Sequence, residues 1–504
     1  MNPRTLEPID PAVVRPSSVE KKRHRKLKLE KLRQEKHATT IQSIWRGAKT
    51  RKELEKNTTA GSPCSGPTKC DNENVDGPAS SQSDEENKEA ISEDIVLPAD
   101  AQKEISSDRK PEDEPQTYSW PETMHDTFEY CESDQWHNLE TASHHDIMAW
   151  VLDNKKVLFR AVTWNMMAKK PPPAEDIQRK LLPLNRFHII AFGTEECERS
   201  IAKSAVNPSK RIWEAYLLEV VGEKYVPLRS HTLQATHIMV FVHAAIMPMV
   251  SEVSSAAVAC GVANKLGNKG GVAVSMKIAD SRFVIVNAHL AAHQNDVDER
   301  NAQIAKIFAE LPSLLVRRSA ADKVIAVDPS VEVDADNKNN DAKVPENGSV
   351  EYDVSMETFA DRLVFMGDLN YRINGNRSVV DKLLRMNMYE VLQSNDQLRL
   401  SKAANKIPTF LHEAPVHFFP TYKLDAGKDD YDTGPKQRIP SWTDRILYKQ
   451  DGMEAIAYDS VRDVRTSDHR PVFASFIVNI DAMKDNYMES SHAFSSESQV
   501  CRIM

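Results

Sequence analysis

The chain has few cysteines and no long apolar run among its 504 residues. Its six cysteines, at positions 64, 70, 131, 197, 260 and 501, show no C-x-x-C spacing, which argues against a disulfide framework or a zinc site and favours a reducing, intracellular setting. No stretch approaches the roughly 18 apolar residues of a membrane-spanning helix, and no apolar signal segment follows Met1. We therefore expect a soluble cytoplasmic protein unless a lipid anchor attaches it to a membrane.

Hydrophobic residues are also scarce, at 40%, whereas 28% of residues are charged and the net charge is -9. This balance favours one large globular domain with disordered flanks. We expect five segments, listed by their residues: a basic helical region at 1–56, an acidic disordered linker at 57–116, a lead-in packed on the domain at 117–150, an α/β domain at 151–480 with a polar insertion at 328–357, and a flexible tail at 481–504.

Within the basic region, one stretch resembles the IQ motif of calmodulin-binding proteins. The matching residues are Ile41, Gln42, Arg46, Gly47 and Arg51. An apolar stripe inside a basic helix suits the groove of an acidic, Met-rich partner, so the resemblance implies calmodulin as a partner. The alternative is a basic helix that is simply solvated or that touches nucleic acid.

From Val157 onward, short apolar segments alternate with helix-like ones. The strand candidates are 157–164, 188–193, 237–243, 271–278, 282–288, 362–367, 443–448 and 471–478. Most of them end in a polar cluster rather than in a plain turn, which predicts a layered sheet structure whose strand ends converge on one rim.

The polar residues at these strand ends are of the types that bind a hard cation and activate water. They are Asn165, Glu196, His289, Asp368, Asn370, Asp444, Asp468 and His469. Oxygen ligands dominate and cysteine is absent, so Mg²⁺ fits this set better than zinc. Taken one at a time, however, each of these residues also fits an ordinary strand cap or a hydrogen-bonded histidine.

The order of several motifs strengthens the case. They are Thr163-Trp164-Asn165-Met166, Gly193-Thr194-Glu195-Glu196, Gly267-Asn268-Lys269-Gly270-Gly271-Val272, Asn287-Ala288-His289-Leu290-Ala291-Ala292-His293, Gly367-Asp368-Leu369-Asn370-Tyr371-Arg372, Phe419-Pro420-Thr421-Tyr422-Lys423, Pro440-Ser441-Trp442-Thr443-Asp444-Arg445 and Thr466-Ser467-Asp468-His469-Arg470-Pro471. In this order they resemble the inositol polyphosphate 5-phosphatases, within the fold shared by deoxyribonuclease I and the abasic-site endonucleases. The resemblance implies an α/β (α+β) four-layer sandwich of two packed, mostly antiparallel β-sheets flanked by helices.

Three residues would form the metal site on this resemblance. Glu196 would bind Mg²⁺, with Asn165 close to the ion and Asp468 in its inner or outer sphere. The chain departs from the family pattern at Glu195, where a glutamine is usual. We interpret this extra carboxylate as tuning of the site rather than loss of activity.

The resemblance also implies the catalytic roles. Asp368 would deprotonate or orient the attacking water and Asn370 would position it. His469, held by Asp444, would stabilise the phosphoryl oxygens, and His289 would donate a hydrogen bond to the same phosphate. Metal and imidazolium charge would offset the repulsion between an anionic phosphate and its nucleophile, and no covalent intermediate is expected.

Five residues resemble the family's contacts to inositol phosphates: Asn268, Lys269, Tyr422, Lys423 and Lys436. The implied reaction is removal of the 5-phosphate from phosphatidylinositol 4,5-bisphosphate or 3,4,5-trisphosphate in membranes, with soluble inositol polyphosphates as further candidates. Cationic side chains beside a phenol hydroxyl suit clustered phosphates. The glycine-rich stretch around Lys269 also fits a plain hairpin turn.

The chain ends in Cys501-Arg502-Ile503-Met504, which resembles a C-a-a-X box for prenylation. Lipidation of Cys501 would place the protein on a membrane, and the basic region would supply the second signal that one prenyl chain needs.

Two other classes of protein remain open at this point. A nuclease of the same fold would share the catalytic parts, but an acidic chain does not suit duplex binding. A non-catalytic adaptor between calmodulin and membranes would need none of the catalytic residues present. The oligomeric state is left open.

Overall fold

The computed structural model describes residues 139, 141–182, 186–198, 203–204, 210–261, 269–327 and 354–481, with side chains in the long helix described up to residue 317. The IQ-like stretch at 41–51, the acidic linker, Asn268 and the tail with Cys501 lie outside these residues, so they remain predictions. Among the residues that the structure describes, every helix is too short or too polar to cross a lipid bilayer.

Two six-stranded sheets form the centre of the fold. The first has the order β11 (Met453–Ser460), β12 (Val472–Asn479), β1 (Lys156–Asn165), β2 (Ile189–Glu195), β4 (Thr236–His243) and β3 (Tyr225–Leu233). Only the β1–β2 pair in this sheet is parallel among the described strands. All of its strands are therefore joined edge to edge in one mixed, mostly antiparallel layer.

The second sheet has the order β5 (Val250–Ala259), β6 (Gly270–Ile278), β7 (Ser281–His289), β8 (Arg362–Asp368), β10 (Asp444–Lys449) and β9 (Leu411–His412). Its described strands pair antiparallel except β7 and β8. The predicted pair of mostly antiparallel sheets is confirmed, and every strand expected from the sequence is found. The sequence pattern missed β3, β5, β9 and β11.

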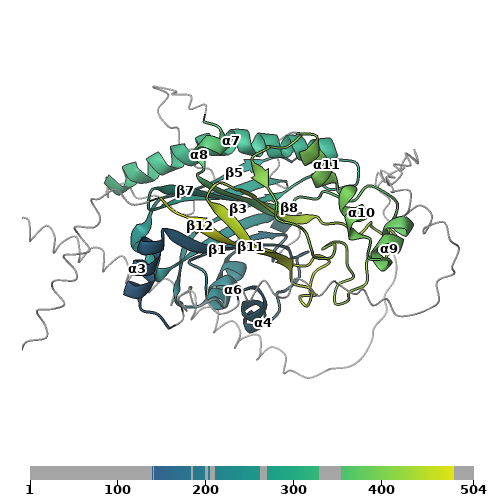
Figure 1. Cartoon of the computed structure of the whole chain (residues 1–504), viewed down its shortest axis with the longest axis horizontal. Coiled ribbons are helices and arrows are strands. Elements are labelled where there is room, and N and C mark those ends of the chain that lie inside the picture. The colour runs from purple at the N-terminus through teal and green to yellow at the C-terminus, as the bar shows by residue number, and fades with distance from the viewer. Residues whose placement is uncertain are drawn as a thin grey trace, which may run out of the picture. The chain divides into compact units, whose positions relative to one another are not determined.

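Helices cover the outer face of each sheet (Figure 1). The helices are α3 (His144–Asn154), α4 (Ala174–Leu181), α6 (Arg211–Val221), η3 (Ala244–Met249), α7 (Val297–Val327), α8 (Met356–Phe359), α9 (Arg377–Arg385), α10 (Tyr389–Ser394) and α11 (Gln397–Ala403). Helix α7 packs Ile304, Ile307 and Leu311 on the second sheet. Helices α4 and α6 pack Ile177 and Trp213 on the first. The four-layer sandwich is confirmed.

The inner core lies between the two sheets and fixes where strand ends point. On β1, Phe159 and Ala161 join this core, and on β8, Val364 and Met366 do so. Because side chains alternate along a strand, every second residue beyond these also faces the gap between the sheets. The final inner-facing residue of several strands therefore reaches the same end of that gap.

Two predicted segment boundaries fall inside elements of the fold. Helix α3 runs across residue 150, where the sequence placed the start of the α/β domain, and it buries Ile147 and Val151 in the core. The predicted polar insertion ends at residue 357, which lies inside α8, and α8 begins at Met356, whose side chain is buried. The last residues of the predicted polar insertion thus belong to the packed domain, because an apolar residue there completes the contact with α7.

Candidate active site

Polar side chains from both sheets meet at one end of the inner gap. Asn165 ends β1, His289 ends β7, Asp368 ends β8 and Asp444 begins the antiparallel strand β10. On its own strand, each is an even number of residues from side chains of the inner core and so faces the same side, and all four are buried. The alternation that builds the core therefore also delivers these groups to a single site.

Gly367 lets two of these strands approach closely. Its φ of +142° is a conformation that glycine adopts and other residues rarely do, and a Cβ there would lie 1.9 Å from the carbonyl oxygen of Ala288. The parallel register pairs Ala288 with Gly367 and His289 with Asp368. The glycine thus holds His289 beside Asp368.

Asp368 is held by three neighbours. Its Oδ2 accepts a hydrogen bond from Asn165 Nδ2 at 3.0 Å and lies 3.4 Å from His289 Nε2. Its Oδ1 accepts a hydrogen bond from the backbone N–H of Asn370 at 3.2 Å. Burial favours the neutral acid, but the His289 hydrogen bond and the charge of His469 outweigh it and lower the pKa of Asp368. The carboxylate is therefore ionised at neutral pH.

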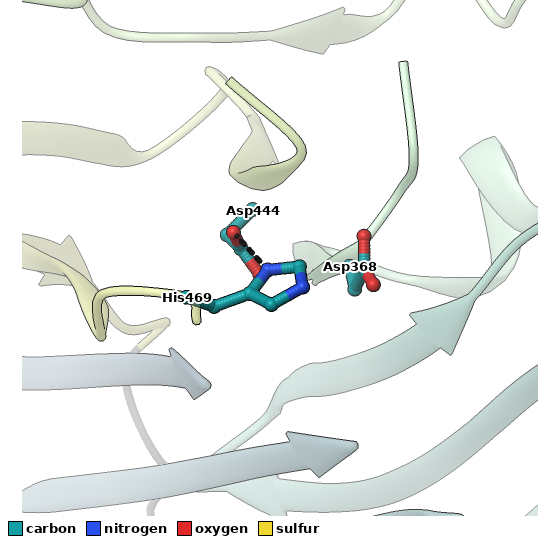
Figure 2. A group of neighbouring side chains, drawn as sticks. All are labelled: Asp368, Asp444 and His469. Carbon is teal, nitrogen blue, oxygen red and sulfur yellow. Dashed lines mark hydrogen bonds and ion pairs between the residues drawn. The ribbon is translucent and has the colours of Figure 1, made fainter. Parts of the chain in front are cut away.

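His469 and Asp444 form a buried pair facing Asp368. The Nδ1 atom of His469 lies 2.9 Å from Asp444 Oδ2 and 3.1 Å from Oδ1. The hydroxyls of Thr421 and Thr443 also donate to Asp444 Oδ2, at 2.6 and 3.0 Å. Figure 2 shows the second ring nitrogen on the side of Asp368.

This arrangement keeps the imidazole charged. Burial lowers the pKa of His469, but Asp444 above all, with Asp368 and Asp468, raises it to about 10. The ligand atoms of Asp368, Asp444 and His469 lie within 4.8 Å of one another, a spacing that could also hold a metal ion. Without a bound metal the imidazole is protonated, and we assign this trio to hydrogen bonding and charge stabilisation.

The residues predicted to bind the metal lie at the same end. Glu196 follows β2 with a φ of +53°, and its backbone is fixed by hydrogen bonds to Ala235 and Ala168. The charge of Glu196 opposes the lowering of the pKa of Lys269 and of His289 by burial. The charge of Asp468 helps to raise the pKa of His469. Carboxylates with one amide oxygen and no thiol form a donor set that fits a hard divalent cation.

Glu195 occupies a more enclosed place than Glu196. It pairs with Asn165 in the parallel register and is fully buried, whereas Glu196 is partly exposed. Neither carboxylate oxygen of Glu195 has a hydrogen-bond partner among the described residues. Burial, followed by the charges of Asp368 and Asp444, raises the pKa of Glu195 well above its usual value. An unpartnered buried carboxylate is costly and needs a compensating group.

Two of the five predicted substrate residues, Lys269 and Tyr422, border this site by charge or contact. Burial lowers the pKa of Lys269 to about 8, opposed by Asp368 and Glu196. The Tyr422 ring lies 4.5 Å from the His469 ring, centroid to centroid. Lys423 follows it in the chain and is partly buried, whereas Lys436 is exposed on the loop before Pro440.

Asn370 holds the loop that follows β8. Its φ is +59°, its Nδ2 donates to the Leu290 carbonyl at 3.1 Å, and its Oδ1 accepts from Arg372 Nη2 at 2.5 Å. Both ends of the amide are thus engaged in fixing the loop, and its predicted role in positioning water remains a prediction.

Sequence reasoning missed several residues of the site. Arg372 lies over the Tyr422 ring at 4.4 Å, and Thr421 and Thr443 brace Asp444. All three lie inside the quoted motifs, next to residues that were given roles. Asn287, on the inner face of β7, crosses to the first sheet and donates to the His237 carbonyl at 3.0 Å.

Comparison with known proteins gives a consistent result. The endonuclease/exonuclease/phosphatase family 2 profile matches residues 162–475. The human phosphatidylinositol polyphosphate 5-phosphatase type IV is 28% identical over 364 residues, which cover 70% of this chain and 50% of that protein. The mouse type II inositol 1,4,5-trisphosphate 5-phosphatase is 30% identical over 263 residues, covering 52% of this chain and 23% of that protein. The chain thus spans half or less of the length of these two relatives.

One solved structure is similar in both fold and sequence. It is the inositol polyphosphate 5-phosphatase domain of spsynaptojanin in complex with inositol (1,4)-bisphosphate and a calcium ion. The similarity has a TM-score of 0.52 at 25% identity and covers 72% of this chain and 98% of that one. The likeness therefore extends over nearly all of that phosphatase domain.

Proposed function

The chain belongs to the endonuclease/exonuclease/phosphatase family 2, and from this premise we propose that it is a magnesium-dependent phosphatase. The proposed reaction removes the 5-phosphate from phosphatidylinositol 4,5-bisphosphate or 3,4,5-trisphosphate, with soluble inositol polyphosphates as further substrates. The names of the human and mouse relatives support this substrate class.

One observation carries the proposal: a charged His469, held by Asp444, faces an ionised Asp368 across a site bordered by Lys269 and Tyr422. A carboxylate can orient water, and an imidazolium can stabilise the charge that develops on phosphoryl oxygens. The bound inositol bisphosphate and calcium ion in the spsynaptojanin domain support a phosphorylated inositol and a divalent cation as the ligands.

In the proposed mechanism, Asp368 orients a water molecule and accepts its proton as the water oxygen attacks phosphorus. The bond between phosphorus and the 5-oxygen of the ring breaks, that oxygen takes a proton from solvent water, and Asp368 returns its own proton to the solvent. The N–H group of His469 that faces Asp368 donates to a phosphoryl oxygen, and Lys269 adds positive charge. A bound Mg²⁺, held by Glu196, Asn165 and Asp468, would supply Lewis-acid charge neutralisation.

The test is phosphate release from a panel of phosphoinositides, soluble inositol phosphates and DNA, with Mg²⁺ and after chelation by EDTA. Wild type should release phosphate from the 5-phosphorylated substrates, and chelation should abolish this. The activity of Asp368→Asn should be lower by about 10³-fold or more, because the substitution removes the carboxylate that orients the attacking water and accepts its proton. Asp451→Asn, in an exposed turn at the end of β10, is the matched control and should keep full activity. Release of nucleotides from DNA alone would identify a nuclease and overturn the proposal.

We also propose that the protein is cytoplasmic and associates with membranes through prenylation of Cys501, and that residues 41–51 bind calmodulin. The C-terminal sequence and the basic IQ-like stretch support this. Membrane fractionation of Cys501→Ser against wild type tests the first part, and a calmodulin pull-down with and without calcium tests the second. Equal membrane fractions, or no capture in either state, would refute the respective part.

A further inference from the structure

Glu195 is the last residue of β2 and faces the gap between the two sheets, directly before the predicted metal ligand Glu196. Ile189 and Ala191 of β2 belong to the core between the sheets, and Gly193 abuts Asn287 of the opposite sheet so closely that a Cβ would lie 2.2 Å from Asn287 Oδ1. Glu195 is the next residue in this alternation. Its carboxylate therefore points into the gap where Asp368 and Asp444 lie.

The charge of Glu195 has little compensation among the described residues: Lys269 attracts it, but less strongly than it attracts Asp368 and Glu196. Its two oxygens have no hydrogen-bond partner among the described residues. Asn287 is near enough to favour the charged form, but it makes no hydrogen bond of acceptable geometry with Glu195 and donates to the His237 carbonyl instead. The nearest charges include two further carboxylates, which repel it, and His469, which is already paired with Asp444.

We propose that Glu195 is an additional carboxylate of the divalent-cation site, so that this chain binds its cation more tightly than a chain with glutamine at this position. A buried carboxylate without a hydrogen bond is stabilised by a cation at short range, and adjacent carboxylates strengthen the attraction further. This inference rests on the proposed function for the location of the cation site, but it does not need the hydrolysis itself.

The direct test measures binding of Mn²⁺ to the full-length protein without substrate, from the electron paramagnetic resonance signal of the free ion. Glu195→Gln keeps the shape of the side chain and removes its charge. We expect its dissociation constant for the tight site to rise about 10–100-fold, as for other groups that support a bound metal. Glu214→Gln, on α6 in the outer layer, is the matched carboxylate-to-amide control and should bind as wild type does.

Thermal unfolding gives a second readout and a check on folding. Without a cation, Glu195→Gln should melt at the same temperature as wild type or higher, because it removes an unpartnered buried carboxylate. Saturating Mn²⁺ should then raise the melting temperature of wild type more than that of the variant.

Equal Mn²⁺ affinity in Glu195→Gln and wild type, or the absence of a tight site in wild type, would overturn the inference. The two proposals also fail separately. Loss of Mn²⁺ affinity in the variant of a protein that releases no phosphate would refute the function and keep the inference. Normal phosphate release by wild type together with unchanged Mn²⁺ affinity in Glu195→Gln would refute the inference and keep the proposed function.

Discussion

The substitution Asp444→Asn tests how the site keeps His469 charged. The asparagine preserves the size of the side chain and can still accept hydrogen bonds from Thr421 and Thr443. It removes the negative charge that chiefly raises the pKa of His469, so burial, which lowers that pKa, then prevails. We expect the imidazole to become neutral near pH 7.

The magnitude follows from the pKa of His469. A rise from 6.5 to about 10 corresponds to about 5 kcal/mol in favour of the imidazolium. With Asp444→Asn the pKa should return to about 6.5 or below, so that at pH 7.5 no more than about a tenth of the molecules carry the charge. Losing a preorganised charge at the transition state should lower kcat by about 10²–10³-fold.

The assay combines a nitrogen NMR titration of the imidazole from pH 5 to pH 10 with kcat measured over the same range. His469→Gln assigns the signal. As a control, Thr421→Val removes one hydrogen bond to Asp444 but no charge, so the pKa of His469 should stay raised in that variant. An imidazole that remains protonated at pH 8 in Asp444→Asn would refute the reasoning, as would a neutral imidazole in wild type.

Three further predictions concern stability. Gly367→Ala should cost at least about 3 kcal/mol in the free energy of unfolding measured with urea, because the new Cβ would meet the Ala288 carbonyl at a positive φ; an unchanged midpoint would contradict the close approach of the two strands. His188 is buried and accepts a backbone hydrogen bond at Nδ1, and burial lowers its pKa to about 3. The folded state therefore excludes a proton that the unfolded chain binds, and stability should fall by about 2 kcal/mol between pH 7 and pH 5 from this residue. His188→Asn should flatten the pH dependence of the unfolding free energy, and an unaltered slope would count against the assignment. Arg445→Met should cost about 3–5 kcal/mol in thermal unfolding, because it leaves two buried carboxylates without their cation; a loss below about 1 kcal/mol would contradict this.

The sequence predicted the strands whose residues are apolar on both faces and missed those that are not. The strands β1 and β8 are buried along nearly their whole length, so an apolar run reveals them. By contrast, β3 is only partly buried and β5 consists largely of serine and alanine. Pairing with β4 and β6 makes them strands, and that information lies in the tertiary structure.

The identities of the site residues followed from the motifs, but the contacts between them did not. Asn165 and Asp368 are 203 residues apart in the chain and are joined by one hydrogen bond across the gap between the sheets. The two neighbouring glutamates differ for a similar reason. Glu195 ends β2 and continues its alternation, whereas Glu196 lies beyond the strand at a φ of +53°, and only the packing of the sheets establishes that the face of Glu195 is the inner one.

The central claim is tested most directly by the product formed from phosphatidylinositol 4,5-bisphosphate labelled in its inositol ring, presented in vesicles with Mg²⁺. We predict that wild type yields phosphatidylinositol 4-phosphate and inorganic phosphate, and that Asp368→Asn yields neither at a comparable rate. Phosphatidylinositol 5-phosphate as the product, or equal turnover by wild type and Asp368→Asn, would contradict the account.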